Sequence, residues 1–270
     1  MKFIFICKVV IVVTLFSLLS EFLSLNKNDH VTLGSAKNEV QVSEQKIQDV
    51  SPKKEEPGQP EEPSSQKQAP VEYSYGNGNQ YLHTYENVPA VRQILLVEQY
   101  ADEPSAATLH LLVKENKIWK EVLQCEAFLG RDGIGKQREG DMRTPTGDYG
   151  FTMAFGILPD PGSLIPYTQL TNSMYVCGDE AYYNQFIDVN KVAHQCGSNS
   201  EHLIDYAPMY NYALFIDYNK DCVYGKGSGI FLHCYGSYRY TAGCVSVPES
   251  VMRKILQTVD SNSRICVYEH

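Results

Sequence analysis

The sequence predicts a β-rich fold, sandwich-like or barrel-like with a few helices, built as a single domain at residues 86–270 of a 270-residue chain. Short apolar runs of strand length recur from residue 91 onward, and turn-forming or charged residues bound each run. Only residues 248–259 place apolar side chains on one helical face, which is why few helices are expected.

The elements follow in order along this domain. Residues 94–100 (ILLVEQY) and 108–114 (TLHLLVK) are expected as strands, and a turn at 114–117 leads into a third strand at 118–128. Further strands of the same kind are expected at residues 213–218, 229–234 and 265–269. The helix is expected to begin at Pro248 and Glu249, since proline suits the first turn and a carboxylate suits the positive end of the helix dipole.

The N-terminal segment, residues 1–25, has the layout of an export signal. Lys2 and Lys8 give it a positive start, and residues 9–20 are almost entirely apolar. This apolar core is short for a membrane-spanning helix, which favours a signal peptide over a signal-anchor, but no clear small-x-small cleavage site follows. We therefore expect an exported protein that is either secreted or anchored in the membrane at its N-terminus.

Residues 26–85 are expected to form a disordered linker rich in proline, glutamate, lysine and glutamine. The run SPKKEEPGQPEEPSSQKQAP at residues 51–70 contains almost nothing that could enter a core. Its prolines exclude a coiled coil. The segment at 73–85 resembles the entry to the folded domain.

The charge balance bears on the class of partner. The chain has 23 Lys and Arg against 32 Asp and Glu, a net charge of -9, and no basic patch. A protein that binds phosphate backbones needs the opposite balance, so nucleic acid is not an expected partner.

The stretch at residues 229–248, GIFLHCYGSYRYTAGCVSVP, carries the residues needed for cysteine nucleophile chemistry. Cys244 is the candidate nucleophile, and His233, at the end of a predicted strand, is the candidate general base and acid. An imidazolium at His233 would stabilise a thiolate at Cys244. Gly243 permits a tight turn that can aim amide N–H groups at a developing oxyanion.

This stretch resembles the L,D-transpeptidase catalytic domain (YkuD-type) family, which has a strand-end histidine, a loop, and Ser/Thr-His-Gly-Cys before an apolar residue. His233, Thr241, Gly243 and Cys244 match that pattern, and residues 143–147 (RTPTG) resemble the family's Thr-Pro-x-Gly element. Three departures stand out: Ala242 replaces the usual histidine, the loop between histidine and cysteine is short, and Ser246 stands where Asn or Arg is common.

The resemblance implies acyl transfer on peptidoglycan stem peptides, with a thioester on Cys244 and 3-3 cross-links as product, in cell-wall biogenesis and cell shape. It implies no cofactor and no metal, and carbapenem-type inhibitors as further ligands. A backbone carbonyl within residues 234–237 is expected to orient His233. Thr241 and Gly243 are expected to shape the turn and the oxyanion hole, and Arg239, Tyr240 and Ser246 to contact substrate.

Two other functions fit the same fold: trimming of stem peptides by an L,D-carboxypeptidase or endopeptidase, and an inactive wall-binding module. A sortase would have a Thr-Leu-x-Thr-Cys stretch and an arginine soon after the cysteine, and both are missing around Cys244. A papain-type protease would have its cysteine before its histidine, which is the reverse of the order here.

The other cysteines allow two interpretations. Seven cysteines follow residue 86, which fits three disulfides plus a free nucleophile in an exported protein, or a set of reduced core residues. Cys177–Cys196 is the favoured pair, although spacing does not fix the connectivity. Cys234 is expected to point to the opposite face of its strand from His233 and to be structural.

A central segment contains further polar side chains. His194, Cys196 and His202 with Glu201 suggest a zinc site, but their spacing matches no standard pattern, so no metal is predicted. Residues 179–188 (DEAYYNQFID) are expected either to line the substrate groove or to form a packed loop.

Overall fold

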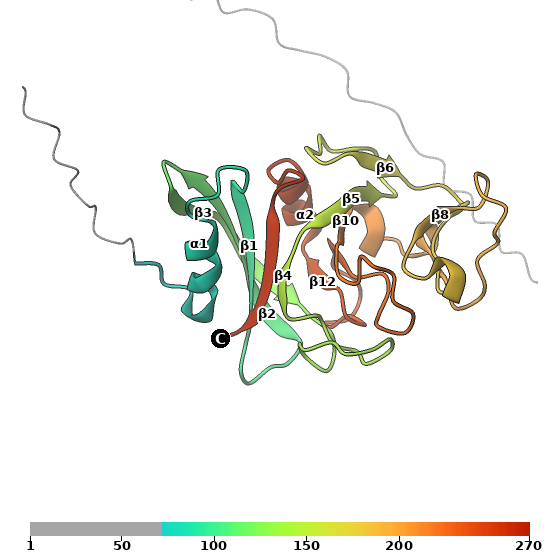
Figure 1. Cartoon of the computed structure of the whole chain (residues 1–270), viewed down its shortest axis with the longest axis horizontal. Coiled ribbons are helices and arrows are strands. Elements are labelled where there is room, and N and C mark those ends of the chain that lie inside the picture. Colours follow the sequence, from blue (N-terminus) through green and yellow to red (C-terminus); the bar gives the residue numbers. More distant parts are fainter. Residues whose placement is uncertain (1–71) are drawn as a thin grey trace, which may run out of the picture. The chain divides into compact units, whose positions relative to one another are not determined.

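A computed structural model describes residues 72–270 of the chain, and its centre is one curled ten-stranded sheet (Figure 1). The strand order is β4-β13-β1-β2-β3-β12-β11-β10-β5-β6, and a second sheet has the order β8-β7-β9. The β-rich prediction is confirmed.

The strands of the large sheet are β1 (Gln93–Gln99), β2 (Ala106–Glu115), β3 (Ile118–Phe128), β4 (Gly147–Tyr149), β5 (Phe151–Gly156), β6 (Tyr167–Gln169), β10 (Ala213–Ile216), β11 (Phe231–Cys234), β12 (Val245–Val247) and β13 (Arg264–Glu269). Those of the small sheet are β7 (Met174–Val176), β8 (Phe186–Asp188) and β9 (Glu201–His202). The α-helices are α1 (Asn79–Tyr85) and α2 (Glu249–Leu256), and 3-10 turns are η1 (Gly76–Gly78), η2 (Glu180–Tyr182), η3 (Leu203–Asp205) and η4 (Met209–Asn211).

The first three strands form the antiparallel meander that the sequence predicts. The turn between β2 and β3 places Asn116 and Lys117 at φ of 50° and 67°, the left-handed geometry of a tight hairpin. The expected strands at 213–218, 229–234 and 265–269 match β10, β11 and β13 within a few residues, and the expected helix matches α2. Patterns in the local sequence therefore predict most strands of the large sheet.

Both faces of β1 are buried, which explains its continuous apolar run. Leu95 and Val97 lie in the main core, together with side chains of α2 and the central strands. Ile94 and Leu96 point the other way and pack against Leu82 of α1. A strand covered on both faces loses the polar alternation of an exposed sheet.

Helix α1 corrects the predicted boundary between linker and domain. Leu82 is fully buried, and the Trp119 indole N–H donates to its carbonyl oxygen at 3.0 Å, so residues 79–85 belong to the folded unit. The expected linker at 26–85 thus ends upstream of residue 86. The helix has few apolar residues of its own. Leu82 is buried because it packs against the face of the sheet, and that contact cannot be predicted from the helix sequence alone.

The expected export signal and most of the expected linker lie outside the described residues. Among residues 72–270, no helix has the length and apolar character needed to cross a bilayer.

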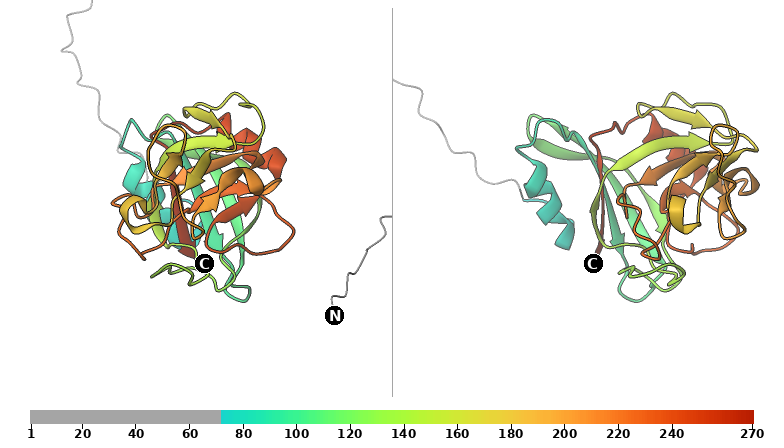
Figure 2. Two further views of the ribbon diagram at one scale, coloured as in Figure 1. Left: turned by 90° about the vertical axis from the view of Figure 1, so that its right-hand side faces the viewer. Right: turned by 45° about the vertical axis from the view of Figure 1, so that its right-hand side comes forward.

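The small sheet was not predicted from the sequence, and neither were β4, β5, β6 and β12 of the large sheet. The strands of the small sheet have three residues or fewer, which is too short for a period-two pattern to emerge. It lies between β6 and β10 in the chain and appears at the far right of Figure 1, and Figure 2 shows the same arrangement from two other sides.

Candidate active site

Strands β11 and β12 lie side by side and bring the candidate catalytic residues together. They pair in parallel, with His233 opposite Ser246. Cys244 is the residue just before β12, and its Sγ accepts a hydrogen bond from the Phe231 backbone N–H at 3.3 Å. The loop of residues 235–243 therefore carries the chain from the histidine back to a cysteine on the neighbouring strand.

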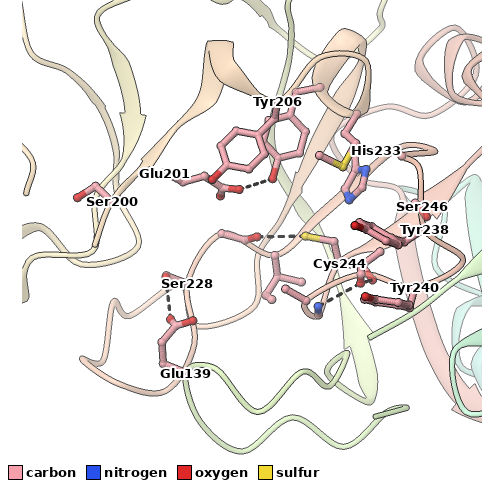
Figure 3. Close-up of a pocket in the computed structure, with 18 of the residues that line it drawn as sticks. Glu139, Ser200, Glu201, Tyr206, Ser228, His233, Tyr238, Tyr240, Cys244 and Ser246 are labelled. Atoms are coloured by element: carbon pink, nitrogen blue, oxygen red, sulfur yellow. Dashed lines mark hydrogen bonds between the residues drawn. The ribbon is translucent and has the colours of Figure 1, made fainter. Parts of the chain in front are cut away.

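His233 and Cys244 both line a pocket of about 450 Å³ (Figure 3). Of the other predicted site residues, Tyr240, Thr241, Gly243 and Ser246 also line it.

Arg239, which the sequence analysis expects to contact substrate, is not among the residues that line this pocket. Its guanidinium pairs with the Glu126 carboxylate at 2.6 Å and lies over the Phe128 ring. The next residue, Tyr240, lines the pocket, whereas Arg239 contacts side chains of β3.

The Cys244 thiol is buried and neutral in the resting structure. Its Sγ donates to the Gly229 carbonyl oxygen at 3.3 Å. Burial, and then the nearby Glu201 carboxylate, raise the pKa of Cys244 to about 12, although the Phe231 N–H and Lys136 act in the opposite direction.

His233 is also neutral. Its Nδ1 lies 2.7 Å from the Cys234 carbonyl oxygen, so Nδ1 carries the proton and Nε2 is free to accept one. This carbonyl is within the range that the family resemblance predicted. Burial lowers the pKa of His233 to about 4, and the hydrogen bond to Cys234 offsets only part of that effect. Burial therefore disfavours the charged form of both groups in the resting structure, which favours a neutral pair over the expected imidazolium–thiolate pair.

Cys234 follows His233 but points away from the pocket. It belongs to the main hydrophobic core, whereas Cys244 and Phe231 belong to the cluster on the other face. The strand alternation predicted this difference, and it makes Cys234 a packing residue.

Two threonines hold the turn before the nucleophile. The Thr241 hydroxyl donates to the Cys244 carbonyl oxygen at 2.7 Å and accepts from the Gly243 N–H at 3.1 Å. The Thr144 hydroxyl, from the RTPTG element, lies 3.2 Å from the same carbonyl oxygen and accepts from the Gly130 N–H at 2.8 Å. The two elements of the family resemblance, a hundred residues apart in the chain, thus meet at one carbonyl.

Gly243 is the position in this turn where only glycine fits. Its φ is +147°, and a Cβ there would lie 2.8 Å from the Arg143 carbonyl oxygen. A larger residue would displace either the turn or the segment that carries Thr144.

Comparison with known families agrees with this geometry. The model of the L,D-transpeptidase catalytic domain (YkuD) matches residues 102–267. The chain belongs to the L,D-transpeptidase catalytic domain family. The match includes both threonines, His233 and Cys244.

Several solved structures resemble this one at low identity. Bd1075 of Bdellovibrio bacteriovorus is 17% identical, with a TM-score of 0.37, over 67% of this chain and 49% of that chain. The helical cell shape determining protein Pgp2 of Campylobacter jejuni is 15% identical, with a TM-score of 0.36, over 70% and 55%. L,D-transpeptidase 1 of Mycobacterium tuberculosis is 12% identical, with a TM-score of 0.31, over 66% and 62%. The chain spans about half the length of the first two. A comparison with curated protein sequences found no match.

Ala242, which departs from the family pattern, is exposed at the edge of the pocket. No hydrogen bond of the turn depends on its side chain. The change from histidine to alanine therefore alters the edge of this L,D-transpeptidase-family pocket and leaves the contacts of Cys244 intact.

Sequence reasoning missed the charged residues of the pocket. Lys136 is buried and pairs with Asp141 at 2.9 Å. Glu201 accepts a hydrogen bond from the Tyr210 hydroxyl at 2.5 Å, and burial raises the pKa of this carboxyl group to about 7 (Figure 3). Lys136 follows a glycine-containing loop and Glu201 begins β9, so no motif linked either to the nucleophile.

The segment expected to line the groove or to pack is a packed loop. Tyr183 is buried and donates one hydrogen bond to the Glu139 carboxylate, and Tyr182 stacks on His194. Neither tyrosine is among the pocket-lining residues.

All seven cysteines in the described residues are free thiols, which contradicts the three-disulfide interpretation. The favoured pair, Cys177 and Cys196, does lie close together, but as thiols beside His194. His202 of the suggested zinc set lies elsewhere, and its ring is 2.8 Å from both Asp205 and the Asn172 carbonyl oxygen.

Proposed function

We propose that this protein is a peptidoglycan L,D-transpeptidase that uses Cys244 as nucleophile and His233 as general base and acid. The observation that carries the proposal is that one pocket holds both side chains, with His233 oriented by the Cys234 carbonyl so that Nε2 is free. A neutral imidazole with a free Nε2 is the form that accepts a proton from a thiol. The activity requires export, which residues 1–25 are expected to direct.

The first half of the reaction forms a thioester. A stem peptide enters the pocket with the carbonyl of its third residue over Cys244, and the thiol leaves its hydrogen bond to Gly229. Sγ attacks the carbonyl carbon as its proton passes to Nε2 of His233. The Cys244 N–H stabilises the oxyanion, and the tetrahedral intermediate collapses as His233 returns the proton to the leaving D-alanine amine.

The second half transfers the acyl group to an amine. A neighbouring stem peptide presents its side-chain amine, His233 removes a proton from that amine, and the nitrogen attacks the thioester carbonyl. The carbon–sulfur bond breaks, the new amide is the 3-3 cross-link, and the thiol regains its proton from His233. No step needs a metal or a nucleotide.

Two measurements test this proposal. Intact-mass spectrometry after incubation with a carbapenem should show one stoichiometric adduct, and Cys244→Ala should abolish it. His233→Ala should slow its formation, and Cys234→Ala, a core cysteine on the opposite face, is the matched control that should keep it. An adduct that persists in Cys244→Ala would refute the assigned nucleophile.

Analysis of products from defined stem peptides separates the proposed reaction from trimming. Dimers joined through their third residues are expected when an acceptor amine is present. Tripeptides alone would assign an L,D-carboxypeptidase, and the absence of both adduct and product from a folded chain would assign a wall-binding module.

A further inference from the structure

Outside the active pocket, three metal-binding side chains from two short segments lie together, and a carboxylate lies beside one of them. Cys177 and Asp179 follow β7, and His194 and Cys196 lie in the loop before β9. Ligand atoms of Cys177, His194 and Cys196 all lie within 4.8 Å of one another. Asp179 adds a carboxylate oxygen at 3.1 Å from Nε2 of His194.

One distance between these atoms matches the separation of two ligands on a common ion. Cys177 Sγ lies 3.4 Å from His194 Nε2. In tetrahedral zinc sites the metal–ligand bonds are about 2.0–2.3 Å, which places neighbouring sulfur, nitrogen and oxygen ligands about 3.3–3.8 Å apart. Small side-chain rotations would bring the Cys177, His194 and Cys196 ligand atoms to bonding distance, and Asp179 lies beside His194 to add its carboxylate.

We propose that Cys177, His194 and Cys196 bind a zinc ion, with Asp179 as the fourth ligand. Two thiolates and an imidazole are the donors that favour zinc over magnesium or calcium, and a carboxylate completes a tetrahedral set. The spacing, Cys-x-Asp and His-x-Cys, provides two ligands from each of two segments.

The surrounding contacts hold these ligands in place. The Tyr182 ring stacks on His194 with centroids 4.1 Å apart, which fixes the plane of the imidazole. The Gly197 N–H donates to Asp179 Oδ2 at 2.8 Å, and such second contacts orient the ligands of metal sites. Cys177 is buried while His194 and Cys196 are half-buried, so an ion can enter from one side.

The ion would stabilise one wall of the active pocket. Residues 189–200 form a loop without helix or strand. The last three residues of this loop and Glu201, which follows it, line the pocket. Short irregular segments of this kind have little core of their own to hold them. Zinc would join the end of this loop to the end of β7 and so fix the position of Glu201. Four protein ligands leave no open coordination position, so the role is structural.

The test is metal content, and it does not depend on the proposed transpeptidase activity. The full chain is purified under reducing conditions without chelator, incubated with zinc, dialysed and analysed by elemental mass spectrometry. Cys196→Ser and His194→Gln should each lose the bound zinc. Cys125→Ser and His202→Gln, which alter a cysteine and a histidine outside the cluster, are matched controls that should keep it. His194 is 22% exposed, so this variant is expected to fold even if Cys196→Ser does not.

Cobalt provides a second readout. Co²⁺ in place of zinc should give the thiolate-to-metal charge-transfer bands and intense visible absorption of a tetrahedral site, and both should disappear in His194→Gln. The proposal is overturned if the reduced, folded wild-type chain retains no zinc, or if His194→Gln retains as much as wild type. A chain that contains a Cys177–Cys196 disulfide and ignores zinc after reduction would also overturn it.

Discussion

The protonation state of Cys244 gives the sharpest prediction. Burial and the Glu201 carboxylate raise its pKa from 9.0 to about 12, so at pH 8 the thiolate fraction is about a thousandfold lower than for an unperturbed thiol. The free enzyme should therefore react slowly with iodoacetamide at Cys244. More importantly, its alkylation rate should rise about tenfold per pH unit from pH 6 to pH 10 without a plateau.

The assay is peptide mass spectrometry of Cys244 alkylation over that pH range. The slope of log rate against pH is the readout, because limited access to a buried thiol lowers every rate by the same factor and leaves the slope unchanged. Glu201→Gln removes the second cause of the raised pKa and should move the whole profile to lower pH.

A rate that is independent of pH between 5 and 8 would refute the reasoning. That plateau is the signature of a preformed thiolate–imidazolium pair, whose charged form persists across the interval. It would mean that His233 carries a proton despite its burial, and that the thiol is activated before substrate binds.

Three further predictions concern the support of the site. Thr144→Val should lower stability by about 1–3 kcal/mol in urea unfolding, because two buried hydrogen bonds are lost, and Thr144→Ser should restore it; an unchanged midpoint would contradict the role assigned to the hydroxyl. Asp141→Asn should cost about 3–5 kcal/mol in the same assay, since it leaves the buried Lys136 ammonium without its partner; a cost near zero would show that water reaches that ammonium. His233 has a pKa of about 4 in the folded chain against 6.5 unfolded, so its contribution is intact above pH 6.5 and stability falls by about 3 kcal/mol as pH drops to 4. His233→Gln should remove this part of the loss of stability at low pH. If wild type and His233→Gln show the same dependence of stability on pH, His233 is not its cause.

The strands and the catalytic pair could be predicted because their signals are local. The short apolar runs, the turn at 114–117 and the helix after Pro248 depend on neighbours in the chain. His233 and Cys244 are eleven residues apart in sequence, and a strand followed by a returning loop is enough to bring them together. The residues of the family motif, Thr241, Gly243 and Cys244, lie in the same short stretch of sequence.

Tertiary structure alone decided what surrounds that pair. The pairing of β11 with β12, and the packing of distant loops, placed Lys136 and Glu201 in the pocket and sent Arg239 out of it. The charge states of His233 and Cys244 also follow from burial, because a pKa depends on the solvent and charges around a group, which a linear motif does not contain. The cysteines show the same limit. Their number in an expected exported protein suggested disulfides, whereas the fold placed two thiols beside an imidazole that lies next to a carboxylate.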